Sequence, residues 1–108
     1  MSYRVKTTPT FDRKAKKLAK KYRSLREDLA ELSAVLKQNP NQGTPIGHNC
    51  YKVRLAIKAK GRGKSFGARV ITFVYVEGEI VNLLSIYDKS DQSSISESEL
   101  RDLLAEIE

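Results

Sequence analysis

The sequence has few of the residues that build disulfides and metal sites. Its 108 residues include one cysteine, Cys50, and one histidine, His48. A single cysteine cannot form an internal disulfide, and these two side chains cannot complete a zinc site of soft ligands. The sequence therefore excludes a disulfide-stabilised scaffold and predicts a protein that uses no cofactor.

Long apolar stretches are also missing. No run approaches the ~20 apolar residues of a membrane-spanning helix, and the opening residues MSYRVKTTPT lack the apolar segment of a secretory signal. We therefore expect a cytoplasmic protein that has no membrane partner. The length and the 40% hydrophobic content predict one domain, residues 1–108, with a single modest core.

Charge is plentiful and unevenly distributed along the chain. Residues 1–64 contain 17 Lys and Arg against 4 Asp and Glu, whereas residues 65–108 contain 3 against 9. This segregation fits a basic surface for a polyanion, with the acidic C-terminal segment lying elsewhere or covering part of that surface. It fits equally well two solvated faces of opposite charge.

The first part of the chain has the pattern of one strand and two helices. A short strand, YRVKTT, ends before Pro9, and a helix at 9–22 follows with Thr8 as its cap. A second helix begins at Ser24, which forms an S-x-x-E capping box with Glu27, and ends before Asn39-Pro40. The short connection between the helices predicts an antiparallel helical hairpin.

The second part has the pattern of a connection, three strands and a helix. The connection spans 40–50, and the strands are expected at 50–58, 67–76 and 80–87. Glu77-Gly78 is the hairpin signal between the last two strands, and Ser96 with Glu99 forms a capping box for the final helix.

The order β-α-α-β-β-β-α predicts a small α+β domain, with the helical hairpin packed on one face of a mainly antiparallel sheet. Strand alternation turns one set of side chains toward the helices, namely Tyr51, Val53, Leu55 and Ile57. Lys52 and Arg54 then point to the opposite face, which we expect to be uncovered and available for function.

Cations gather on that opposite face and on the loop after its strand. Lys52 and Arg54 project in parallel and could bind neighbouring phosphate oxygens. The loop KAKGRGKS adds Lys58, Lys60, Arg62 and Lys64 on a flexible glycine backbone. We favour nucleic-acid binding over a merely solubilising loop, because the strand and loop cations converge.

The last strand ends in SIYDKSDQ, where Tyr87 and Lys89 share a face if the strand extends that far. A tyrosine there can stack on a base beside a lysine that acts on a phosphate ester, although packing is an alternative role. Arg69 joins this pair only if the hairpin register places it opposite Tyr87. We predict that register, through a three-residue loop or a bulge of the same effect.

These segments carry a family resemblance over nearly the whole chain. FDRKAKKLAKKY, the strand-loop-strand YKVRLA…GKSFGARVI and the tail LLSIYDKSDQ resemble RelE/ParE-superfamily toxins of bacterial type II toxin-antitoxin systems, closest to the RelE and HigB branch. The resemblance implies a metal-independent endoribonuclease that cleaves messenger RNA on the ribosome, with ribosomal RNA contacts, and a cognate antitoxin as partner.

The resemblance also implies roles for individual residues. In the family the RNA 2′-hydroxyl attacks its own phosphate, which leaves a 2′,3′-cyclic phosphate and a 5′-hydroxyl. Arg54 and Arg69 match the phosphate-binding positions, and Tyr87 matches the tyrosine that stacks on the base. Lys52 or Lys89 would act as general base or acid.

The sequence departs from the family pattern at three positions. Val81 stands where RelE has another arginine, and Lys89 stands where HigB has histidine, which leaves the identity of the acid open. Phe66 replaces a glycine before the arginine strand, and it is either a stacking platform for RNA or a cover for the sheet edge.

Other candidates are less favoured. His48 lies in the connection and Cys50 at a strand start, so we do not predict catalytic roles for them. The helix lysines form a solvated face, with ribosomal RNA contact as the alternative: Lys14, Lys16, Lys17, Lys20 and Lys21. Two other functions stay open, a ParE-like poison of DNA gyrase and a non-catalytic nucleic-acid-binding module.

Overall fold

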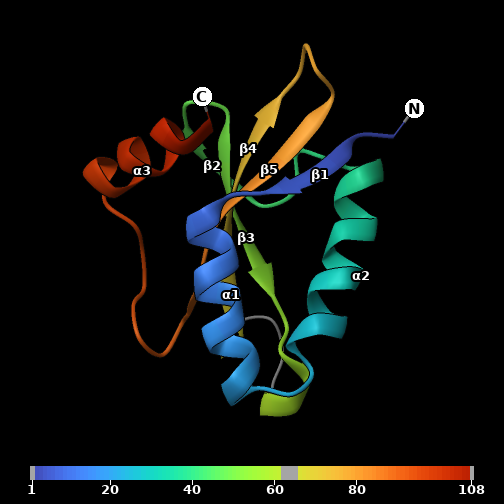
Figure 1. Ribbon diagram of the computed structural model, residues 1–108, viewed down its shortest axis with the longest axis vertical. Helices are drawn as coiled ribbons and strands as arrows, with labels where there is room; N and C mark the ends of the chain where they lie inside the picture. Colours follow the sequence, from blue (N-terminus) through green and yellow to red (C-terminus); the bar gives the residue numbers. More distant parts are fainter. Residues whose placement is uncertain (1, 62–65, 108) are drawn as a thin grey trace.

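A computed structural model describes residues 2–61 and 66–107. Its main elements follow the chain as β1 Arg4–Thr7, α1 Pro9–Lys21, α2 Leu25–Gln38, β2 Thr44–Gly47, β3 Cys50–Leu55, β4 Ala68–Tyr75, β5 Ile80–Asp88 and α3 Glu97–Leu104 (Figure 1). Short 3-10 turns follow β3 at Lys58–Lys60 (η1) and α3 at Ala105–Ile107 (η3). This arrangement confirms the predicted α+β class. No helix in these two described ranges is long and apolar enough to cross a membrane.

The five strands form one mixed sheet in the order β1-β5-β4-β3-β2. β1 runs parallel to β5, and the other neighbouring strands are antiparallel. β2 lies inside the predicted connection and was missed, because four residues containing a proline and a glycine carry little strand signal. The sheet is therefore mainly antiparallel, as predicted, with one additional edge strand.

The helical hairpin forms where the sequence predicts it, and α1 and α2 lie side by side in Figure 1. Thr8 caps α1, its hydroxyl accepting the Phe11 backbone N–H at 3.3 Å. The predicted capping box of α2 is wrong, because Ser24 makes no side-chain cap. The Ser24 hydroxyl instead donates to Asp28 Oδ2 at 2.8 Å and accepts the Ala59 backbone N–H.

One core lies between the hairpin and the sheet. β3 contributes Val53 and Leu55 to this core, together with Ile57 just beyond the strand. Their packing confirms the predicted alternation, which turns Lys52 and Arg54 to the opposite face.

The opposite face is not uncovered, contrary to expectation. A second cluster joins sheet residues Ile71, Leu84 and Tyr87 to Leu100 and Leu103 of α3. α3 begins with the predicted capping box of Ser96 and Glu99. The apolar stripe of this helix needs a surface to pack on, and β4 and β5 provide it.

A bulge sets the register between β4 and β5. Tyr75 pairs with Ile80, which leaves a four-residue loop at 76–79, and the register moves by one residue between Ile71 and Thr72. Leu84 is the additional residue of β5, and beyond it Arg69 pairs with Tyr87. The four-residue loop differs from the predicted three-residue loop, whereas the predicted alternative, a bulge that pairs Arg69 with Tyr87, is confirmed.

Candidate nucleic-acid interface

Three of the predicted site residues form a row across β3, β4 and β5, near one end of these strands. Arg54 on β3 lies opposite Arg69 on β4, and Arg69 lies opposite Tyr87 on β5. Residues paired in this way project from the same face of a sheet. Lys52 belongs to the next row, where its partner is Ile71.

Burial differs sharply along this row. Arg54 is exposed, whereas Arg69 and Tyr87 retain only 5% and 6% of their accessible surface. Burial and the Arg54 guanidinium lower the pKa of Arg69, and burial raises the pKa of Tyr87, so the tyrosine keeps its proton at neutral pH. The Tyr87 hydroxyl is buried without a hydrogen-bond partner among the described residues. A buried polar group without a partner calls for an explanation, such as a functional role or an ordered water.

Lys89 lies beyond the row, at a hollow where β5 ends. The strand extends to Asp88, and the Lys89 backbone N–H still donates to Gly67 O at 3.1 Å. The Lys89 ammonium lies 6.0 Å from the centre of the half-exposed Phe66 ring, within the range of a cation–π contact. Both side chains line an open hollow of about 490 Å³ with Lys60 and Ser90.

Asp88 forms a buried hydrogen-bond network beneath this hollow, and sequence analysis did not single it out. Oδ1 accepts bonds from Lys60 Nζ at 2.8 Å and from the Ser90 N–H at 2.9 Å and hydroxyl at 2.8 Å. Oδ2 accepts the Tyr22 hydroxyl at 2.6 Å. Burial alone would raise the pKa of Asp88, but the bonds from Lys60, Tyr22 and Ser90 outweigh it and lower that pKa. The spacing of Asp88 and Ser90, two residues apart, is typical of an Asx turn and is the sequence signal that could have identified this turn.

The described part of the basic loop, residues 58–61, is less free than predicted. The turn η1 is fixed to α2, because the Lys58 and Ala59 backbone N–H groups donate to Asp28 and Ser24. Lys58 also forms an ion pair with Glu31. Lys60 is committed to Asp88, so the two described lysines of this loop both have acidic partners. Arg62 and Lys64 lie outside the described residues.

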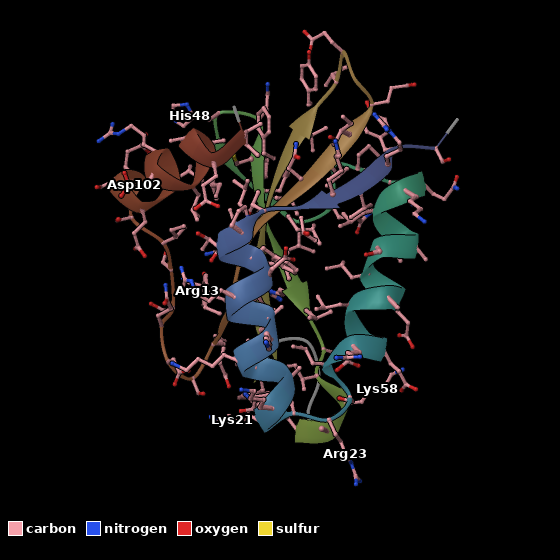
Figure 2. All side chains as sticks on the ribbon, in the orientation of Figure 1. Arg13, Lys21, Arg23, His48, Lys58 and Asp102 are labelled. Carbon is pink, nitrogen blue, oxygen red and sulfur yellow. The ribbon has the colours of Figure 1, made fainter. Side chains whose placement is uncertain are left out.

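His48 and Cys50 lie apart from the row and the hollow. Cys50 is 1% exposed, and burial raises the pKa of its thiol to about 11, which leaves it protonated. His48 Nε2 lies 2.8 Å from Glu97 Oε2 at the start of α3. Figure 2 shows His48 beside α3, while Lys58 lies near the α1–α2 turn. No group of three or more His, Cys, Asp or Glu suited to a metal ion occurs in the part of the chain described.

The lysines of α1 form the basic helix face that the sequence predicts. Lys16, Lys17, Lys20 and Lys21 are exposed, and Lys14 is half-buried.

Comparison with solved structures identifies the fold. The chain superimposes on isolated RelE toxin from Escherichia coli with a TM-score of 0.62, 18% identity, and coverage of 96% of this chain and 98% of RelE. A mutant of the same toxin in the free state gives a TM-score of 0.59 and 20% identity, with coverage of 98% of this chain and 94% of the mutant chain. A chain of the toxin-antitoxin complex RelBE2 from Mycobacterium tuberculosis gives a TM-score of 0.61 and 22% identity, with coverage of 82% of this chain and 99% of that chain. No protein-family model matches the sequence. The protein thus has the RelE-like toxin fold.

Proposed function

We propose that this protein is the toxin of a type II toxin-antitoxin pair, and that it is an endoribonuclease acting on messenger RNA at the ribosome. The observation that carries the proposal is the row of Arg54, Arg69 and Tyr87 on three adjacent strands. The fold shared with RelE toxins supports it. The RelBE2 complex supports an antitoxin as partner.

The proposed reaction is an intramolecular phosphoryl transfer. The RNA 2′-oxygen attacks the adjacent phosphorus and forms a P–O2′ bond, while the P–O5′ bond breaks. A base takes the 2′-hydroxyl proton, and an acid gives a proton to the leaving 5′-oxygen. The products are a 2′,3′-cyclic phosphate and a 5′-hydroxyl, and cations stabilise the charge on the equatorial oxygens.

The geometry supports a division of roles. Arg54 and Arg69 are adjacent across two strands, so their guanidinium groups suit a phosphate between them. Tyr87 lies next in the row and would stack on a base. Lys52 and Lys89 stand at two different edges of this group, and we propose them as the base and acid without assigning which is which.

In the structure α3 covers part of this site. Tyr87 packs with Leu100 and Leu103, and its hydroxyl has no partner among the residues described. We therefore infer that RNA reaches Tyr87 after α3 moves away from the sheet, and that the exposed Arg54 makes the first contact.

The test is to map transcript 5′ ends after brief induction of the wild type, Arg54→Ala and Arg4→Ala. Arg54 is exposed, so its removal should leave the fold intact while slowing cleavage about 10²–10³-fold. Arg4 is an exposed arginine on β1, away from the row, and serves as the charge-matched control. Equal cleavage by both variants would refute the site.

A non-catalytic nucleic-acid-binding module is the second candidate, because the burial of Arg69 and Tyr87 leaves Arg54 as the exposed member of the row. This function predicts salt-dependent RNA binding and no cleavage products on translating ribosomes. Stabilised gyrase cleavage complexes with intact transcripts would instead indicate a ParE-like poison.

A further inference from the structure

Asp88 occupies an unusual position beside the proposed site. Its neighbours in the chain are Tyr87 and Lys89, both proposed to act on RNA, yet Asp88 itself is only 1% exposed. A carboxylate so placed cannot contact substrate directly, and its negative charge would repel phosphate. Its effect on the reaction must therefore pass through the groups that it binds.

The carboxylate holds both sides of the turn that carries Lys89. Oδ1 accepts the Ser90 N–H at 2.9 Å and the Ser90 hydroxyl at 2.8 Å, which closes an Asx turn across Lys89. The Asp88 carbonyl accepts the backbone N–H groups of Asp91 and Gln92. The Lys89 N–H is itself bonded to Gly67 O, so the backbone on either side of this residue is fixed.

The same carboxylate connects three separate parts of the chain. Lys60, just after β3, reaches Oδ1 at 2.8 Å, and Tyr22, at the end of α1, reaches Oδ2 at 2.6 Å. The Lys60 ammonium also lies 5.4 Å from the centre of the Tyr22 ring. These contacts attach the Lys89 turn to the helical hairpin, and they hold Lys60 in the wall of the hollow that Lys89 and Phe66 line.

We propose that Asp88 is a positioning residue that fixes the turn carrying Lys89, and so sets where the Lys89 ammonium stands beside the Phe66 ring. This inference rests on the proposed endoribonuclease function. It assigns Lys60 mainly to Asp88 and not to RNA, because its charge is already paired.

Asp88→Asn tests the proposal, with Asp91→Asn as the matched control. Asp91 lies in the same turn, carries the same charge and is exposed. We expect Asp88→Asn to lower the single-turnover cleavage rate on ribosomes programmed with messenger RNA about 10–100-fold, as misplacement of a reacting group does. Because Lys60 loses its partner and the site gains positive charge, RNA affinity should stay equal or increase. Asp91→Asn should leave the rate unchanged.

A readout independent of catalysis separates this proposal from the proposed function. In wild type the Phe66 ring should shift the Lys89 ε-methylene proton resonances, and Asp88→Asn should return them toward the values of a solvated lysine. If wild type cuts no RNA, the function fails while this spectrum still tests the positioning. If Asp88→Asn does not fold, Ser90→Ala is the second variant, because it removes the hydroxyl bond to Asp88 and keeps the ion pair between Lys60 and Asp88. It should change the Lys89 resonances and the cleavage rate in the same direction, by a smaller amount. An unchanged rate and spectrum in the folded variant would overturn the proposal.

Discussion

At the scale of single residues, Gly67 shows how closely the backbone before β4 approaches the end of β3. It stands just before β4, and a Cβ placed on it would lie 1.9 Å from the Leu55 carbonyl oxygen. The obstacle is backbone, which cannot move aside like the end of a flexible side chain. The Gly67 carbonyl also accepts the Lys89 N–H, so this close approach helps to set the end of β5.

We expect Gly67→Ala to lower the free energy of unfolding by about 2–3 kcal/mol, the upper part of the range for overpacking. Gly47→Ala is the control, because Gly47 has a positive φ of 93° but open space around its Cβ position. Its cost should be about 1 kcal/mol, from conformation alone. Urea unfolding measures the free energy of unfolding of both variants. Equal losses would show that the Leu55 carbonyl moves aside to make room for the new Cβ.

Residue placement was predictable where it depended on local alternation. The division of β3 into Val53 and Leu55 on one face and Lys52 and Arg54 on the other follows from a period of two. The role of Asp88 was not predictable, because its partners Tyr22 and Lys60 are distant in sequence and only the fold brings them together.

At the scale of elements, α3 is held by its apolar stripe and by polar contacts at both ends. At its start Glu97 meets His48, and just beyond its end Glu106 accepts the backbone N–H of Thr10 at 3.1 Å and the Thr10 hydroxyl. Thr10 lies in the first turn of α1, where a carboxylate is favoured by the helix dipole. These contacts stabilise the arrangement in which α3 packs on Tyr87.

Weakening this attachment should favour the open site. We expect Glu106→Ala to raise the single-turnover RNA cleavage rate about 5- to 150-fold, since the two bonds to Thr10 are worth roughly 0.5–1.5 kcal/mol each. Ser98→Ala, an exposed change on the same helix, should have no effect. Faster hydrogen exchange across 97–107 should accompany the gain. A slower reaction would mean that RNA binds with α3 in place.

The elements themselves were predictable to different degrees. α1 and α2 have apolar spacing and clear ends, and both were predicted to within a residue or two. β2 was missed, because Thr44–Gly47 is held by pairing with β3 and not by its own propensity. The charge pattern left open whether the C-terminal segment covers the sheet, and the place of α3 was not predicted, because an amphipathic helix does not reveal which surface receives it.

At the scale of the whole molecule, the Asp88 network couples folding to pH. The pKa of Asp88 is lowered in the folded protein, so the ionised carboxylate stabilises the fold. This stabilisation is complete above the unfolded pKa of about 3.9 and is lost progressively as the pH falls below that value. The network joins α1, the turn after β3 and the end of β5, so this loss reaches the entire fold.

We expect Asp88→Asn to lower the free energy of unfolding by about 3–5 kcal/mol at pH 7, because Lys60 is left largely buried without its charged partner. The difference in the free energy of unfolding between this variant and wild type should be smaller at pH 3, because there the ionised carboxylate stabilises the wild type less. Urea unfolding at pH 7, 5 and 3 measures this, with Asp91→Asn running parallel to wild type. A constant difference between pH 7 and 3 would contradict the assignment.

The bulge at Leu84 has a genetic consequence. Before it, Val81 and Leu83 face the helical hairpin, and after it Ile86 faces the hairpin while Tyr87 faces α3. Loss of the single codon for Leu84 would remove the additional residue, and plain alternation would continue from Leu83 through Ser85 and Ile86. Tyr87 would keep its pairing with Arg69 and its place on the same face as Arg54. A three-base deletion, with no change in reading frame, would thus leave the row assembled and remove only the Leu84 side chain from the cluster under α3.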